Sequence, residues 1–149
     1  MSTRLTADNA KQSLTAHAAA RGLETHQKYG PRTGWTDLLR LLDDRACVRY
    51  PCEILFDASA LFPGEFAFPA PKGERPEDGF TLHVHPHFAA DLDQVPFLAL
   101  YHLAAINYGV FASADDAETF AAAALGLEKE DYYLALCRLA DQLNEPGCA

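Results

Sequence analysis

The periodicity of the hydrophobic residues changes twice along this chain, and this change limits the fold more than any single motif. Before residue 46 and again after residue 90, apolar residues recur at helical spacing. Between residues 46 and 90 the apolar residues form short β-type runs, ACVRY, EILF, EFAF and FTLHVH, which prolines and glycines separate. We therefore predict a single α+β domain over residues 1–149. Its antiparallel sheet of three or four strands is packed by about five helices, in the order ααβββ(β)ααα.

Local signals mark the ends of the five predicted helices, through capping residues at the start and glycine or proline at the end. The first begins after Thr6 and ends at Gly30-Pro31, and the second carries Trp35, Leu38, Leu39 and Leu42 on one face. The third lies between Asp93 and Gly109, the fourth between a capping box (Ser113 with Asp116) and Gly126, and the fifth covers 130–144, before Pro146-Gly147.

The composition is that of a globular protein with room for a hydrophobic core. The chain has 149 residues, of which 49% are hydrophobic and 22% are charged. No apolar run reaches the roughly 20 residues that a membrane helix needs. The segment MSTRLTADNAKQ lacks the apolar centre of a secretory signal. We expect a soluble cytoplasmic protein without a membrane partner.

The acidic charge is unevenly distributed. The formal net charge is −9, which disfavours binding to nucleic acid unless basic residues are segregated. Residues 1–50 contain eight Lys and Arg against five Asp and Glu, whereas residues 51–149 contain four against sixteen. Either the acidic residues cover solvated helix faces, or the basic N-terminal part of one subunit meets the acidic part of another in a homodimer.

Four cysteines, Cys47, Cys52, Cys137 and Cys148, form no C-x-x-C pair. In the cytoplasm they would stay reduced, so we expect small buried thiols rather than disulfides or a zinc ribbon.

The stretch FTLHVHPHFA places His83, His85 and His87 at every second position. On a strand this spacing directs side chains to one face, and neutral imidazoles are good zinc ligands. Leu82 and Val84 would then face the core. The sequence therefore leaves two interpretations open: a zinc site on these three histidines, or a polar strand face that uses histidine.

A zinc site needs a further ligand or an open position for water. Glu65 on the preceding strand, or Asp91 and Asp93 beyond the histidines, could supply a carboxylate. Such a site would suit hydrolysis by zinc-bound water.

The third predicted helix resembles the active helix of zincin metalloproteases, whose motif is H-E-x-x-H. The matching window is His102-Leu103-Ala104-Ala105-Ile106. Leu103 takes the place of the general base and Ile106 that of the second zinc ligand, so protease activity by that route is excluded. We interpret His102 as a hydrogen-bonded core histidine.

No G-x-S-x-G, P-loop or G-x-G-x-x-G motif is present. The function predicted from the sequence is therefore a binding or accessory protein without a catalytic motif, with an unidentified protein or small molecule as its partner. The alternative is a zinc-dependent hydrolase built on His83, His85 and His87. A dense aromatic group around the predicted sheet (Phe62, Phe66, Phe68, Phe80, Phe88) is either core or the wall of a pocket beside the histidines.

Overall fold

Five α-helices and three β-strands make up the ordered elements of the described chain. The structure is a computed structural model that describes residues 6–144. In chain order the elements are α1 (Ala7–Tyr29), α2 (Trp35–Leu42), β1 (Cys52–Phe56), β2 (Ala67–Pro71), β3 (Phe80–Val84), α3 (Val95–Tyr108), α4 (Ala114–Leu125) and α5 (Lys129–Asn144). Short 3-10 turns lie at Pro76–Asp78, Pro86–Ala90, Leu92–Gln94 and Gly109–Phe111. The α+β class is confirmed.

The sheet is mixed, which corrects the prediction of an antiparallel meander. Its strand order is β1-β3-β2, so the last strand lies in the centre. β3 runs parallel to β1, with Ile54 opposite Leu82, and antiparallel to β2, with Pro69 opposite the same leucine. Segment 57–66 connects β1 to β2 and crosses the end of β3. The 72–79 loop then leads from β2 into β3, which lies between the two edge strands. Only the β2–β3 pair is a hairpin.

Two strand boundaries also differ from the prediction. ACVRY forms turns and bends rather than a strand, and β2 begins at Ala67 and continues through two prolines that we expected in a loop. Proline is tolerated there because β2 is an edge strand, where a residue without an N–H can face outward. β3 follows the prediction, with Leu82 and Val84 fully buried.

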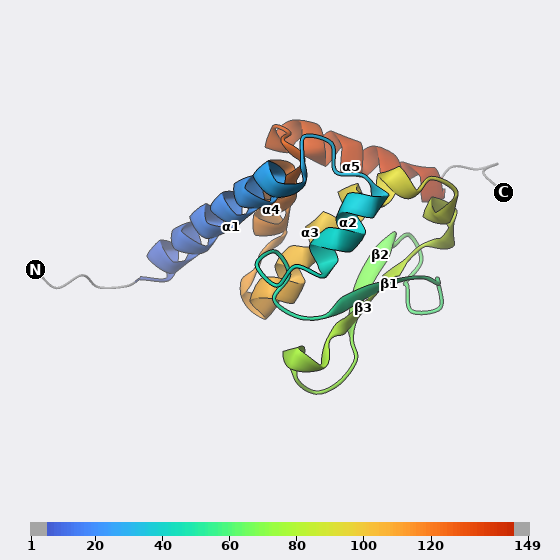
Figure 1. Ribbon diagram of the computed structural model, residues 1–149, viewed down its shortest axis with the longest axis horizontal. Coiled ribbons are helices and arrows are strands. Elements are labelled where there is room, and N and C mark those ends of the chain that lie inside the picture. The colour runs from blue at the N-terminus through green and yellow to red at the C-terminus, as the bar shows by residue number, and fades with distance from the viewer. Residues whose placement is uncertain (1–5, 145–149) are drawn as a thin grey trace, which may run out of the picture.

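The helices lie on one side of the sheet (Figure 1). One buried cluster joins the inner sheet face to residues of all five helices, including Leu38, Leu98, Phe120 and Tyr132. α3 is buried almost all round, as its uninterrupted apolar sequence predicts. On α2 the buried leucines are Leu38, Leu41 and Leu42, whereas Leu39, predicted to be inward, is partly exposed.

α1 and α4 lie side by side, and small residues allow their backbones to approach closely (Figure 1). A Cβ atom on Gly22 would lie only 2.5 Å from the carbonyl oxygen of Phe120 and 2.7 Å from the Cβ of Ala123. The predicted cap of α4 is confirmed: Ser113 Oγ accepts the N–H of Asp116 at 3.1 Å, and Gly126 ends the helix in the left-handed conformation. None of the helices described in residues 6–144 has the length and apolarity to cross a membrane.

Candidate functional site

The predicted histidine face exists in part. His83 lies on the outer face of the sheet, opposite Leu55 of β1 and Phe68 of β2, and both of these side chains are more than two-fifths exposed. Its Nδ1 is buried and has no hydrogen-bond partner among the described residues. The central strand therefore presents an imidazole between two apolar side chains, which is a poor setting for a charged ligand set.

His85 and His87 have partners of their own. The backbone N–H of His87 donates to Nδ1 of His85 at 3.1 Å, and Nε2 of His87 lies 3.0 Å from Oε1 of Gln142 on α5. Burial lowers the pKa of His85, and the neighbouring His87 lowers it further. Both histidines follow β3, where Pro86 starts a 3-10 turn, so the alternation of the strand ends before His87.

The carboxylates expected to complete a zinc site point elsewhere. Glu65 Oε1 accepts the N–H of Phe62 at 2.7 Å, and Asp93 Oδ1 accepts the N–H of Trp35 at 3.1 Å. Within residues 6–144 no group of three or more His, Cys, Asp or Glu side chains is placed to hold a metal ion. These donors do not fit a zinc ion as they stand, and the site on His83, His85 and His87 stays a prediction.

The predicted aromatic group divides between core and surface. Phe88 is buried, Phe62 is 77% exposed, and Phe68 and Phe80 line a groove whose described lining contains no histidine. His102 packs against the rings of Phe66 and Tyr101, with ring centroids 5.9 Å and 5.2 Å away. Its Nε2 has no partner among the described residues, so the hydrogen bond we expected at that atom is not formed.

A different cluster has the geometry of a binding site. A cavity of about 380 Å³ lies between α1, the segment joining α2 to β1, and the end of α3. Three arginines line it: Arg21 from α1, and Arg45 and Arg49 from the joining segment. We call it the arginine pocket. Its other lining residues are His17, Thr25, Ala46, Cys47, Asn107 and Tyr108, so none of the described residues that line it is acidic.

Asn107 fixes the wall of the arginine pocket. Its Oδ1 accepts the backbone N–H of Arg49 at 2.9 Å, and its Nδ2 donates to the carbonyl oxygen of Cys47 at 2.9 Å. The buried side chain of Asn107 thus satisfies one backbone donor and one backbone acceptor of the joining segment 43–51. Without it, these two groups would need a strand partner. This contact accounts for the failure of ACVRY to form a strand.

Asp44 holds the other end of the same segment. Its carboxylate pairs with Lys28 and accepts hydrogen bonds from the Tyr29 hydroxyl (2.7 Å) and the backbone N–H of Ala46 (3.0 Å). These partners, Lys28 first, hold the pKa of Asp44 far below its usual range. Asp44 does not line the pocket, and Lys28 compensates much of its negative charge.

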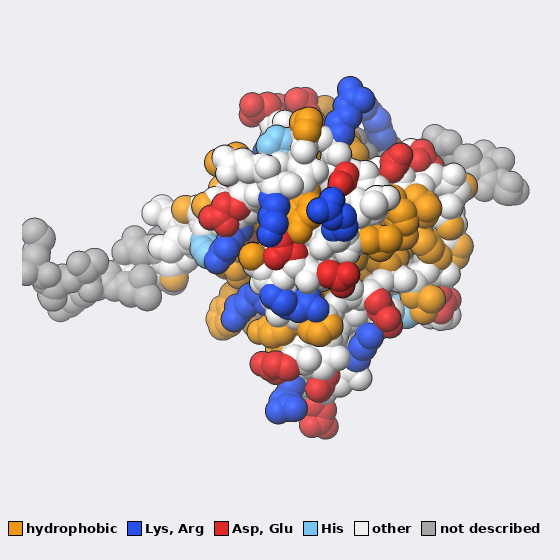
Figure 2. Space-filling view, viewed as in Figure 1, with side chains coloured by type: hydrophobic (Ala, Val, Ile, Leu, Met, Phe, Trp, Pro, Cys, Tyr) orange, Lys and Arg blue, Asp and Glu red, His pale blue; other side chains and the backbone are white. Residues whose placement is uncertain are grey.

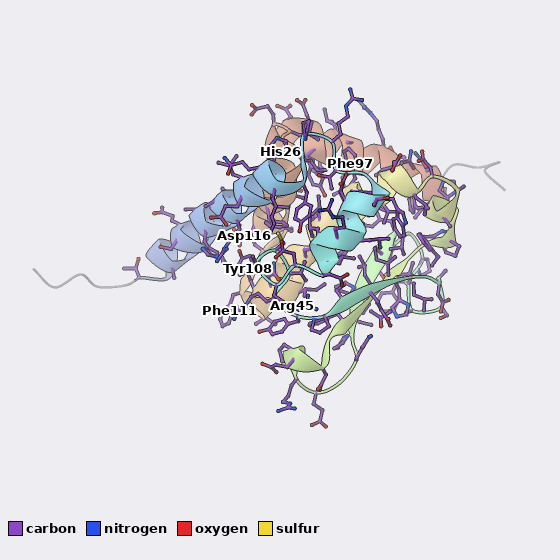
Figure 3. All side chains as sticks on the ribbon, in the orientation of Figure 1. His26, Arg45, Phe97, Tyr108, Phe111 and Asp116 are labelled. Atoms are coloured by element: carbon purple, nitrogen blue, oxygen red, sulfur yellow. The ribbon has the colours of Figure 1, made fainter. Side chains whose placement is uncertain are left out.

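The arginines of the pocket have few acidic partners of their own. Arg45 donates to the carbonyl oxygens of Leu42 (3.0 Å) and Val48 (3.4 Å), and Arg49 donates to that of Asn107 (3.2 Å). Of these three arginines, only Arg21 forms an ion pair with another described residue, an exposed one with Glu24 at 3.2 Å. Figure 3 shows Arg45 and Tyr108 near each other where α3 ends. Arg45 and Arg49 thus supply guanidinium groups with no carboxylate partner among the described residues, and an oxyanion can accept hydrogen bonds from such groups.

Two other groups bear on the chemistry of the pocket. Burial raises the pKa of the Cys47 thiol, so this cysteine stays protonated and is a poor nucleophile. Burial also raises the pKa of Tyr108, while Arg21 and Arg49 oppose that rise, so both guanidinium groups act on this hydroxyl. The described lining therefore suits binding better than covalent catalysis.

Sequence reasoning did not identify this pocket. The available signal was the excess of basic residues in positions 1–50, from which all three arginines come. Arg49 is held by Asn107, 58 positions later in the chain, and no local pattern reveals that contact. Comparison of the chain with models of protein families, with curated proteins and with solved structures gives no match.

Proposed function

We propose that this chain is a binding or accessory protein whose ligand carries an oxyanion, a phosphate or carboxylate group, held in the arginine pocket. One observation carries the proposal: three guanidinium groups line one recess, and no acidic side chain among the described residues lines it with them. The three arginines bring like charges to one recess, where they repel one another although solvent screens their exposed side chains. A bound anion would remove this repulsion.

The chemistry of the wall supports an oxyanion over a neutral ligand. Arginine presents several N–H groups in a planar fork that matches carboxylate and phosphate oxygens. The rings of Tyr108 and His17 lie edge to face, with centroids 5.5 Å apart. The tyrosine hydroxyl and the imidazole nitrogens can add hydrogen bonds to the ligand. No comparable observation favours the zinc-dependent hydrolase, which remains the alternative.

Titration with inorganic phosphate tests this proposal. In ¹⁵N-labelled protein at constant ionic strength, we expect the arginine side-chain Nε–Hε signals of Arg21, Arg45 and Arg49 to shift with a common saturation curve. Arg21→Gln should weaken binding about tenfold or more, since a charge-assisted hydrogen bond contributes roughly 1.5–3 kcal/mol. Arg21 is the best position to change because its side chain is 45% exposed and its ion pair lies at the surface.

Arg138→Gln is the matched control, since it removes the same charge from an exposed position on α5 that lies outside the pocket lining. It should leave the phosphate affinity unchanged. The proposal is wrong if phosphate shifts none of the three signals saturably, or if the two variants weaken binding equally.

A further inference from the structure

An apolar groove adjoins the arginine pocket. It has a volume of about 890 Å³ and lies between the first turns of α1, the end of α3, and the sheet edge near β2. Leu14, Tyr50, Phe80 and Ile106 form much of its wall. Of the described residues that line the groove, none is acidic, and its one formally charged side chain is Arg49.

Two side chains at the rim of the groove are unusually exposed for their type. Val110 is 96% exposed and Phe111 is 81% exposed. Gly109, at φ 64°, ends α3 and turns the chain into the 3-10 turn that carries both residues. Figure 3 shows Phe111 at the outer end of this turn, close to Tyr108. Exposed large apolar side chains beside a concave apolar wall are typical of a binding surface.

The pocket and the groove meet at a shared wall. Arg49, Asn107 and Tyr108 line both. The guanidinium carbon of Arg49 lies 5.6 Å from the centre of the Tyr50 ring, which lines the groove. Basic and hydrophobic side chains likewise lie next to each other on the visible face, where the joining segment reaches the sheet (Figure 2). A single molecule could therefore contact arginines at one end and apolar side chains at the other.

We infer that the ligand of the arginine pocket is an anionic amphiphile: an oxyanion attached to an apolar chain, with the anion in the pocket and the chain in the groove. The inference rests on the proposed function, which supplies the anion. Charge complementarity fixes the orientation, because the basic groups lie at one end of the combined cavity and Arg49 stands at the junction. The groove offers the chain the apolar contact that favours its removal from water.

Calorimetric titration with ethyl, butyl, hexyl and octyl phosphate, below micelle-forming concentrations, tests the inference. We expect affinity to rise about two- to fourfold for each added CH₂ until the groove is filled. Octanoate, measured in parallel with octyl phosphate, distinguishes a carboxylate head from a phosphate head, because the tighter of the two identifies the head group. 1-Octanol, which has the chain without the anion, should bind at least tenfold more weakly than the better of the two.

Phe111→Ser should remove most of the dependence on chain length and leave the affinity for inorganic phosphate unchanged. Phe62→Ser is the control, because Phe62 is 77% exposed and lies outside the groove. Both positions are exposed, so both variants should fold.

The failures of the two proposals are distinguishable. If inorganic phosphate binds but affinity is independent of chain length, the amphiphile is wrong and the oxyanion pocket stands. If neither phosphate nor any alkyl phosphate binds, both are wrong. Sedimentation velocity on the same samples identifies another occupant: a dimer that Phe111→Ser dissociates would mean that a second copy of the chain fills the groove, and would overturn the inference.

Discussion

The environment of His102 has a strong effect on the charge of its imidazole. The imidazole lies on α3 among apolar neighbours, against the rings of Phe66 and Tyr101. Burial lowers its pKa from 6.5 to about 4. In the unfolded chain the ring therefore binds a proton at higher pH than in the folded protein. Between pH 6.5 and 4 the unfolded state holds more protons, so the free energy of unfolding falls as the pH falls through this range.

We expect the free energy of unfolding to fall by about 2 kcal/mol between pH 7 and pH 5 on account of His102 alone. His102→Leu should lose that part of the pH dependence, since leucine does not titrate and leaves no unpaired nitrogen. Urea unfolding of both proteins at pH 7 and pH 5 measures the difference. An unchanged pH dependence in His102→Leu would contradict this account.

At the scale of the elements, the close packing of α1 against α4 depends on one residue, Gly22. Glycine usually weakens a helix by roughly 1 kcal/mol relative to alanine. At Gly22, however, an added methyl group would collide with the backbone of α4, and carbonyl oxygens and helical amides cannot move aside as a flexible side chain can. The close approach of the two helices therefore depends on the missing Cβ.

Gly22→Ala should consequently destabilise the protein by about 1–3 kcal/mol, against the gain that helix propensity alone predicts. Thermal unfolding followed by circular dichroism gives the change. Ser13→Ala, at an exposed position of the same helix, is the control and should be neutral or slightly stabilising. If Gly22→Ala raised the melting temperature as much as Ser13→Ala, the helices would not be packed as closely as described.

The elements also differ in how far the sequence predicts them. Helix ends depend on neighbouring residues, such as Ser113 with Asp116 or Gly126, so the pattern predicted both ends of α4 correctly. Asp93, expected to cap the third helix, instead accepts the N–H of Trp35, and Gln94 precedes α3 without a side-chain cap. Strand pairing depends on residues far apart in the chain, and alternation looks the same in parallel and antiparallel pairs. The parallel β1–β3 pair therefore could not be read from the sequence. The arginine pocket was missed for the same reason, because its lining residues come from distant parts of the chain and Asn107 bonds to Arg49 and Cys47 across 58 and 60 positions.

For the whole molecule, the separation of basic and acidic residues has a local explanation. A second ground for a homodimer in the sequence is that narrow alanine-rich stripes on the first and fifth predicted helices bury little area each, but α1 packs along α4 in the same chain, and its Ala18 is buried. The basic residues Arg21, Arg45 and Arg49 gather at a concave site. Dimerisation remains a prediction, although contacts within one chain explain the burial of alanine on α1 and the gathering of the basic residues.

A single domain predicts one cooperative unfolding transition, and the chain provides two probes for testing it. Trp35 is the only tryptophan, and its ring centroid lies 5.9 Å from that of Phe56, so its fluorescence reports the junction of α2 with the sheet. Far-UV circular dichroism reports chiefly the helices, of which α1 and α4 lie away from the sheet (Figure 1).

Because one buried cluster contains side chains from every helix and from the inner face of the sheet, loss of either part exposes apolar surface of the other. The two probes should therefore give the same urea midpoint and the same slope. A fluorescence transition completed before the helical signal changes would instead mean that the sheet with α2 unfolds separately. The chain would then behave as two units joined at the arginine pocket. Phosphate bound across that boundary should bring the two urea midpoints together, because a ligand stabilises only the state that binds it.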